Sequence, residues 1–201
     1  MKVAVLGATG SVGKIVVRRA LEAGHEVTAI ARNPDSLQPH PHLTLVKADV
    51  MRPEALTSHL VGQDAVVSAF GPRPKSDPKE QGAFANSLAS AMKTAGVQRV
   101  VIVSVAFLFN NSIAGQLGRL FFREVVKGAG QAEEIWKSSG LDWTILRPPQ
   151  FTDGPSKETI RSKVDGLPSF GFKIRREDVA RFLLEEAART DHFHKIVGIS
   201  N

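Results

Sequence analysis

Tyrosine and cysteine are both absent from the 201 residues of this chain. Without a phenol, the chain cannot form a Tyr-x-x-x-Lys pair, in which a lysine lowers the pKa of a tyrosine that exchanges a proton with a substrate oxygen. Without a thiol, it can form no disulfide, cysteine–zinc site or iron–sulfur cluster. Any proton that a reaction needs must come from another group or from solvent.

Long hydrophobic runs are missing as well, because no apolar segment approaches the ~20 residues that a membrane-spanning helix requires. The first segment, Val3–Leu6, is too short for a signal peptide. With 42% hydrophobic residues, the chain suits one globular domain over residues 1–201. We expect no membrane partner, and the lack of cysteine favours a cytoplasmic location.

The formal net charge of +6 raises nucleic acid as a partner. The basic residues are dispersed, however, and no helix-turn-helix or zinc pattern accompanies them. A modest positive field also suits a protein that captures a polyanionic small molecule. We therefore expect no nucleic-acid partner. The two His-x-His pairs, at positions 40–42 and 192–194, lack a third ligand, so we expect no metal site.

A glycine-rich turn directly follows the first apolar segment and opens a helical stretch. The turn reads Gly7-Ala8-Thr9-Gly10-Ser11-Val12-Gly13. Glycines without Cβ atoms allow a tight turn and let a pyrophosphate approach the backbone, while free N–H groups at the helix start face the anion. Strand, glycine turn and helix in this order predict a dinucleotide site. Its contacts are expected from Gly7, Thr9, Gly10, Ser11 and Val12.

Short β-rich runs alternate with helical patterns along the whole chain, which is typical of a parallel, doubly wound sheet. We predict an α/β, single-domain Rossmann fold with a mostly parallel sheet of six or seven strands. The predicted strands are 2–6, 26–30, 43–47, 65–68, 99–104, 143–146 and 195–199. The predicted helices are 11–23, 53–60, 80–95, 131–138 and 177–189.

Residues 107–130 depart from the alternation. Their apolar positions recur at roughly helical spacing, so the segment is either a wall of the substrate site, an oligomer contact or a further core helix. Together with residues 150–172, it forms the predicted substrate-side region. We expect a monomer or a weak homodimer.

Arg32 follows the second predicted strand, about 20 residues after the glycine turn, where dinucleotide folds contact the adenosine ribose. A carboxylate there would bind the 2′-hydroxyl of NAD, whereas a guanidinium pairs with a 2′-phosphate. Arg32 therefore favours NADP(H). The alternative is a surface arginine beside a turn at Asn33-Pro34.

Two further pairs follow the third and fourth predicted strands. Asp49 and Val50 stand where an adenine ring would rest, since a carboxylate accepts from its exocyclic amine and a backbone N–H binds a ring nitrogen. Phe70 and Gly71 end the fourth strand, where glycine leaves room for pyrophosphate and ribose. Either pair alone would be an ordinary loop, but in register with the glycine turn we interpret both as cofactor contacts.

Near the expected nicotinamide position, the polar candidates for catalysis are Ser104 and Gln150. Ser104 would bind the substrate or the carboxamide, unless it is a strand-end hydroxyl bonded to backbone. Pro148 and Pro149 stiffen the approach of Gln150, and Phe151 would supply a hydrophobic wall. Without a phenol, acceptors that need little acid from the protein, such as flavins, quinones and linear tetrapyrroles, suit this site better than secondary alcohols do.

Four stretches of the chain resemble the atypical short-chain dehydrogenases of the NmrA-like group. They are the glycine turn, Ala48-Asp49-Val50, the run 104–108 and Ser-Gly-Leu-Asp-Trp-Thr-Ile-Leu-Arg-Pro at 139–148. Gly71-Pro72-Arg73 and Pro148-Pro149 are most similar to its biliverdin-IXβ reductase (flavin reductase) branch. The resemblance implies NADPH-dependent reduction of flavins and some tetrapyrroles, and adds Arg73 to the cofactor contacts. Val105 replaces a serine of that branch and Gln150 a histidine, which favours a flavin or quinone over a tetrapyrrole.

The leading hypothesis is thus an NADPH-dependent oxidoreductase whose partner is a small planar acceptor, with FMN or another flavin as a possible substrate. The alternative is a non-enzymatic regulator that senses NADP(H) and binds a protein partner, as some NmrA-like proteins do.

Overall fold

The computed structural model describes residues 1–71, 77–109 and 122–201. Its strands are β1 (Lys2–Leu6), β2 (Glu26–Ala31), β3 (Leu43–Lys47), β4 (Ala65–Ser68), β5 (Arg99–Val103), β6 (Asp142–Arg147), β7 (Gln150–Thr152), β8 (Arg161–Val164), β9 (Lys173–Arg175) and β10 (Lys195–Ser200). Its helices are α1 (Gly13–Glu22), α2 (Glu54–Leu60), α3 (Lys79–Ala95), α5 (Arg123–Ser138) and α6 (Arg176–Ala188), with short 3₁₀ turns η1 (Pro34–Ser36) and η2 (Ala106–Leu108).

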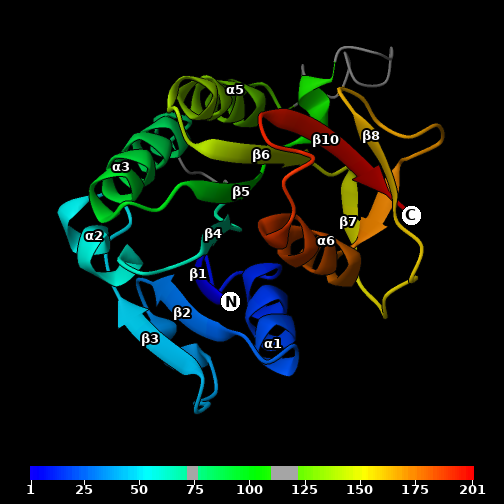
Figure 1. The fold of residues 1–201 in the computed structure, drawn as a ribbon. Helices are drawn as coiled ribbons and strands as arrows, with labels where there is room; N and C mark the ends of the chain where they lie inside the picture. Colours follow the sequence, from blue (N-terminus) through cyan, green and yellow to red (C-terminus); the bar gives the residue numbers. More distant parts are fainter. Residues whose placement is uncertain (72–76, 110–121) are drawn as a thin grey trace.

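Eight strands form one sheet in the order β3-β2-β1-β4-β5-β6-β10-β8 (Figure 1). Every pairing in it is parallel except that of the edge strand β8 with β10. The strand order reverses between β1 and β4, because the chain runs outward from β1 to β3 and then returns to the other side of β1. In open α/β sheets, ligands bind beyond the carboxyl ends of the strands at such a reversal.

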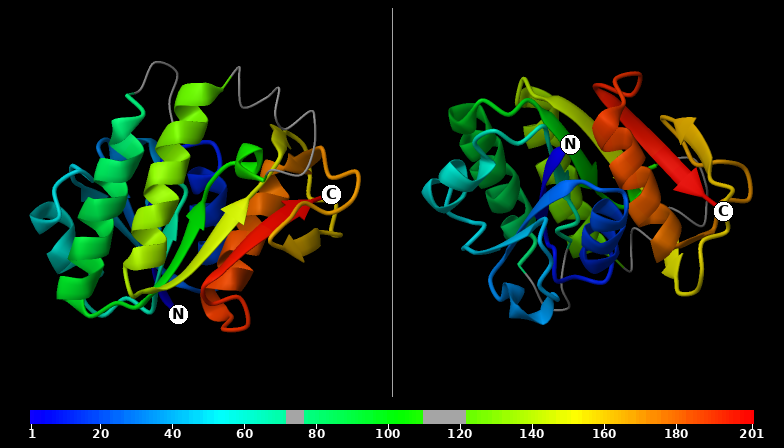
Figure 2. Two further views of the ribbon diagram at one scale, coloured as in Figure 1. Left: turned by 90° about the horizontal axis from the view of Figure 1, so that it is seen from above. Right: turned by 60° about the horizontal axis from the view of Figure 1, so that its bottom comes forward.

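Helices cover both faces of the sheet (Figure 2). α1 packs beside α6 on one face, and α2, α3 and α5 pack as neighbours on the other. Alternate residues of β1 serve the two layers: Val3 and Val5 are buried with α1 and α6, whereas Ala4 and Leu6 are buried with α3 and α5. Strands buried on both faces are continuous apolar runs, as the sequence of β1 is.

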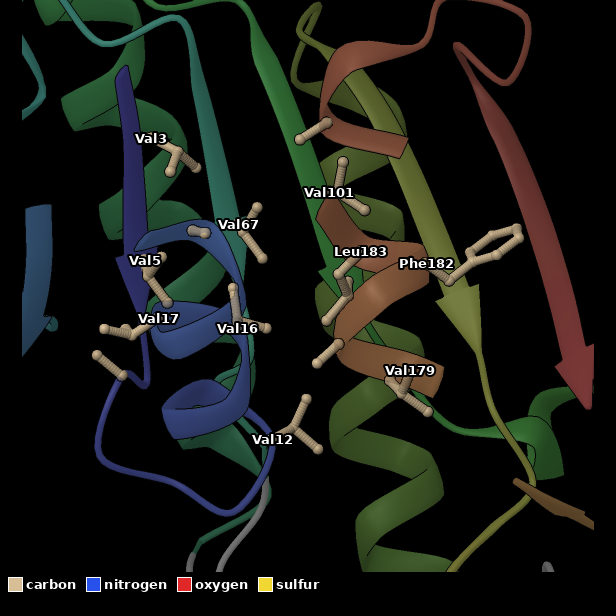
Figure 3. Packing of buried hydrophobic residues seen from close by; sticks show 14 of the residues in the cluster. Val3, Val5, Val12, Val16, Val17, Val67, Val101, Val179, Phe182 and Leu183 are labelled. Carbon is tan, nitrogen blue, oxygen red and sulfur yellow. The ribbon is translucent and has the colours of Figure 1, made fainter. Parts of the chain in front are cut away.

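On the α1–α6 face, apolar side chains from both helices close over the central strands (Figure 3). Val12, at the start of α1, belongs to this core with Val16 and with Val179 of α6. The glycine turn is therefore anchored in the core by the residues that follow it.

All seven predicted strands are present and lie in the parallel part of the sheet, with ends that differ by at most one residue. The sequence prediction missed β7, β8 and β9, which have only three or four residues each. β8 is exposed along its whole length. Strands this short carry too little apolar alternation to be recognised, and they form only because longer elements position them.

The helix predicted over 131–138 was wrong at its start, because α5 begins at Arg123. The glycines at positions 128 and 130 argued against a helix there. Gly128 is needed for packing, since a Cβ at this position would lie 2.5 Å from the carbonyl oxygen of Pro78, at the start of α3. The segment 107–130 thus ends in a core helix in which Val126 and Ala129 are buried, while residues 110–121 lie outside the described residues.

Asp178 of α6 joins three distant parts of the chain. Its fully buried carboxylate accepts hydrogen bonds from the Ser156 hydroxyl, the Lys157 N–H at 3.1 Å and the Asn201 side-chain amide at 2.7 Å. Burial by itself would raise the pKa of Asp178, but the hydrogen bonds outweigh it and lower the pKa below its ordinary value. The carboxylate thereby holds the loop after β7 against α6 and β10.

We expect Asp178→Asn to lower the free energy of unfolding by about 1–3 kcal/mol, because the amide cannot accept all of these hydrogen bonds. A lowered pKa in the folded state stabilises the protein above the ordinary carboxyl pKa, and this contribution is lost as the pH falls through the folded-state value. Urea unfolding at several pH values measures the difference. Equal stability of both proteins at pH 7 would contradict this role.

Candidate functional site

The glycine turn after β1 lies directly against the end of β4. Gly7 has a φ of +73°, and the N–H of Gly10 donates to its carbonyl oxygen at 2.9 Å. A Cβ on Gly7 would lie 2.8–2.9 Å from backbone atoms of Ala69 and Phe70. Only glycine meets both requirements, a left-handed backbone and contact with a neighbouring strand.

Gly13, the first residue of α1, has an even tighter environment. A Cβ there would lie 2.1 Å from the carbonyl oxygen of Gly7. This contact seats the start of α1 on the turn and aims the helix N-terminus across the carboxyl edge of the sheet. No side chain caps this end, and no acidic residue lies in the first turn of the helix.

The backbone N–H groups at this helix start are available to a ligand. Within the described residues, the N–H groups of Ser11 and Val12 make no hydrogen bond. Thr9 is half-buried, while Gly10 and Ser11 are exposed. The turn therefore combines unpaired donors with the positive end of the helix dipole, which is the arrangement that binds phosphate groups.

A cavity of about 330 Å³ opens beside the turn, beyond the ends of β2, β3 and β4. It is lined by Arg32, Asp49, Val50, Met51, Phe70, Asp77, Lys79, Glu80 and Ala83. Four predicted site residues from three different loops thus converge here, namely Arg32, Asp49, Val50 and Phe70. The other five lining residues were missed, namely Met51, Asp77, Lys79, Glu80 and Ala83. Four of them lie at the start of α3, and nothing in the sequence shows that this end turns toward β2.

The contacts of three of these side chains show which of their groups could meet a ligand. Arg32 is exposed and makes no hydrogen bond or ion pair with any other described residue. Asp49 accepts from the N–H of Met51 at 3.0 Å through one oxygen, which leaves the other free. The ring of Phe70 stacks on Phe84 with centroids 4.2 Å apart. Within the described part of the chain, the cavity therefore offers an unpaired guanidinium at Arg32, one oxygen of Asp49 without a hydrogen bond and a fixed aromatic wall.

Ser104 lies just past β5, and its hydroxyl faces α5. The hydroxyl donates to Oε1 of Glu133 at 2.5 Å. Arg147, at the end of β6, donates to the same oxygen through Nε at 2.9 Å and to the other oxygen through Nη2 at 2.5 Å. The guanidinium also lies over the ring of Phe109, at 4.7 Å. The expected alternative for Ser104, a bond to backbone, was wrong, since its partner is a carboxylate.

Glu133 and Arg147 were not predicted as site residues. Glu133 is only 3% exposed. A signal for it existed, because Val126, Ala129, Glu133 and Trp136 have helical spacing, so that one carboxylate interrupts an apolar stripe. A buried carboxylate needs a cation and hydrogen-bond donors, and Arg147 and Ser104 provide them.

Gln150 and Phe151 begin β7, directly after Pro149. Gln150 is exposed and pairs with Lys173 of β9. Phe151 packs partly buried against the core that includes Val12, and the guanidinium of Arg176 lies 5.5 Å from its ring centroid. The half-buried Pro149 and the exposed Gly71 do not line the cavity around Arg32. Arg73 lies outside the described residues.

The described residues contain no cluster of three or more side chains that could hold a metal ion. Over the same ranges, no helix combines the length and apolarity that crossing a membrane would require. What the site does present is an anion cradle, a cavity with a free guanidinium, and a polar cluster around Glu133. The turn and the cavity suit the phosphates and the adenosine end of a dinucleotide by their chemistry. The turn presents the N–H groups of Ser11 and Val12, which no described residue accepts, and the cavity presents the guanidinium of Arg32.

We expect Gly13→Ala to abolish dinucleotide binding, measured by titration calorimetry, and to lower the melting temperature, because the new methyl group would collide with Gly7. Gly82→Ala is the matched control. A Cβ on Gly82 makes only ordinary contacts of 3.6 and 3.9 Å with side chains, and alanine in a helix interior is favoured by about 1 kcal/mol. A Gly13→Ala protein that binds as tightly as Gly82→Ala would contradict the role of the turn.

The family model described as NAD(P)H-binding matches residues 7–190. The chain is 32% identical to the uncharacterized chloroplastic protein At2g34460 of Arabidopsis thaliana, over 98% of the chain and 76% of that protein. Among solved structures, a Rossmann-fold NAD(P)-binding family protein of Shigella flexneri has a TM-score of 0.80 and 25% identity, over 100% of the chain and 93% of that protein.

A further structure of similar fold is SP1627 from Streptococcus pneumoniae, whose name proposes an NADH-flavin reductase. Its TM-score is 0.83 at 24% identity, and the match covers 100% of the chain and 99% of that protein. The predicted Rossmann fold and the NmrA-like resemblance are confirmed by these matches. The chain belongs to the NAD(P)H-binding family of atypical short-chain dehydrogenases/reductases.

Proposed function

We propose that this protein is an NADPH-dependent reductase that transfers a hydride to a planar conjugated acceptor, with a flavin as the first candidate. The guanidinium of Arg32 lines the 330 Å³ cavity and pairs with no other described residue, and it carries the cofactor part of the proposal. The acceptor part rests on the family, on the missing phenol and on the polar cluster around Ser104. The name of SP1627 points in the same direction at the level of fold.

Each part of the site has a role in holding the cofactor. The turn from Gly7 to Val12 would bind the pyrophosphate through its backbone N–H groups. Asp49 and Val50 would bind the adenine edge, with Phe70 as a wall, and Arg32 would pair with the 2′-phosphate. NADPH, when bound, supplies the hydride, and one proton from solvent completes the two-electron reduction of the acceptor.

Hydride transfer to such an acceptor demands little from the protein beyond position. Phe151 and Pro149 follow β6, the strand beside β5, so they lie at the carboxyl edge of the sheet where an acceptor would stack on the nicotinamide. Holding two reactants face to face can lower the barrier by about 7–11 kcal/mol. The chain needs no catalytic acid of the tyrosine type for this reaction.

We expect Arg32→Gln to raise the Kd for NADPH about 10–100-fold, because a charge-assisted hydrogen bond contributes about 1.5–3 kcal/mol. The Kd for NADH should change less than about 2-fold. Arg52→Gln is the control, since Arg52 is an exposed arginine paired with Glu54 at 2.8 Å. Equal weakening of both cofactors by Arg32→Gln would mean that the 2′-phosphate is bound elsewhere.

Turnover is tested by following NADPH oxidation at 340 nm in the presence of FMN, riboflavin, a quinone panel and biliverdin. We expect oxidation with flavins or quinones and little with biliverdin. Tight NADPH binding without oxidation by any acceptor would reject the reductase and favour the alternative, a regulator that senses NADP(H). Location in the cytoplasm and a monomeric or weakly dimeric state remain predictions, which fractionation and sedimentation would test.

A further inference from the structure

The cluster of Ser104, Glu133 and Arg147 fixes the direction of one hydrogen bond. Both oxygens of Glu133 accept from Arg147, and Oε1 accepts from Ser104 as well. Arg147 can only donate, and its bidentate pair with Glu133 uses both carboxylate oxygens as acceptors. The single hydroxyl proton of Ser104 is therefore committed to Glu133.

A serine hydroxyl has one proton and two lone pairs. With the proton directed at Glu133, the remaining lone pairs of Ser104 can only accept. Ser104 is half-buried at the carboxyl edge of the sheet, and its backbone N–H is held by the carbonyl oxygen of Leu146 at 2.7 Å. Both its position and the direction of its hydroxyl are thus fixed by β6 and α5.

We infer that Ser104 serves the reaction as a hydrogen-bond acceptor and not as an acid, and that Glu133 and Arg147 are positioning residues that impose this direction. The inference rests on the proposed reductase function and narrows its substrate class. The acceptor presents an N–H or O–H group toward β5, as the imide of a flavin does. It takes its proton from solvent after the hydride arrives.

A general acid contributes about 100-fold or more to the rate, whereas one neutral hydrogen bond changes binding about 5–10-fold. We therefore expect Ser104→Ala to raise the KM for FMN about 5–10-fold and to change kcat less than about 2-fold. Ser104→Thr, which restores the hydroxyl, should recover most of the KM. The Kd for NADPH should be the same in all three proteins, because the adenosine cavity is not altered.

Glu133→Gln tests the positioning role, since its amide can donate to Ser104 and release the hydroxyl proton. We expect it to raise the KM as Ser104→Ala does, and the double variant to resemble either single variant, because Glu133 acts through Ser104. Glu134→Gln is the control on the next residue of α5, where an exposed carboxylate pairs with Lys137 at 2.7 Å. If Glu133→Gln fails to fold, the Ser104 variants alone test the inference.

The outcomes separate the two proposals. No NADPH oxidation by the wild-type protein overturns the reductase function, and this inference with it. Wild-type turnover with a kcat that falls 100-fold or more in Ser104→Ala overturns the inference alone, because Ser104 would then be the acid. Unchanged KM and kcat in Ser104→Ala would also overturn it, since the hydroxyl would not reach the acceptor.

Discussion

The contact between two glycines and a neighbouring strand determines the geometry of the whole site. Gly13 rests on the carbonyl of Gly7, and Gly7 rests on the backbone after β4. Any side chain at either position would push α1 away from the sheet. Because α1 is buried against α6 through Val12 and Val16, the turn cannot shift without disturbing the core. The anion cradle is therefore as rigid as the hydrophobic layer beneath it.

The second organising feature is the reversal of strand order between β1 and β4. It brings the ends of β2, β3 and β4 around one cavity, which a cation, a carboxylate and an aromatic ring from distant parts of the chain line together. On the other side of β4, the ends of β5 and β6 meet α5 around Glu133. Burying a carboxylate costs free energy unless hydrogen-bond donors surround it. Arg147 and Ser104 donate to Glu133, and this fixes the direction of the Ser104 hydroxyl. The described groups around the cavity thus include the unpaired guanidinium of Arg32, whereas Arg147 and the hydroxyl proton of Ser104 are directed at Glu133.

Under our proposal, the chain supports redox chemistry without a tyrosine. A phenol is needed where a substrate oxygen must be protonated as the hydride moves. A conjugated acceptor delocalises the added electrons and can take its proton from water. Under our proposal, the chain retains what positions two planar molecules and has no side chain that would deliver a proton between them.

The sequence by itself determined the seven parallel strands of the sheet, the glycine turn and four of the residues that line the cavity. Each depends on local pattern: apolar runs for buried parallel strands, glycine where a Cβ cannot fit, and a charge at a fixed distance along a βαβ unit. Only the tertiary structure decided the rest. The early start of α5 depends on Gly128 meeting Pro78 across two helices, and β7 to β9 are too short to form alone. The partner of Ser104 stands 29 residues away, and a hydrogen bond between side chains that distant follows from packing, which no local pattern records.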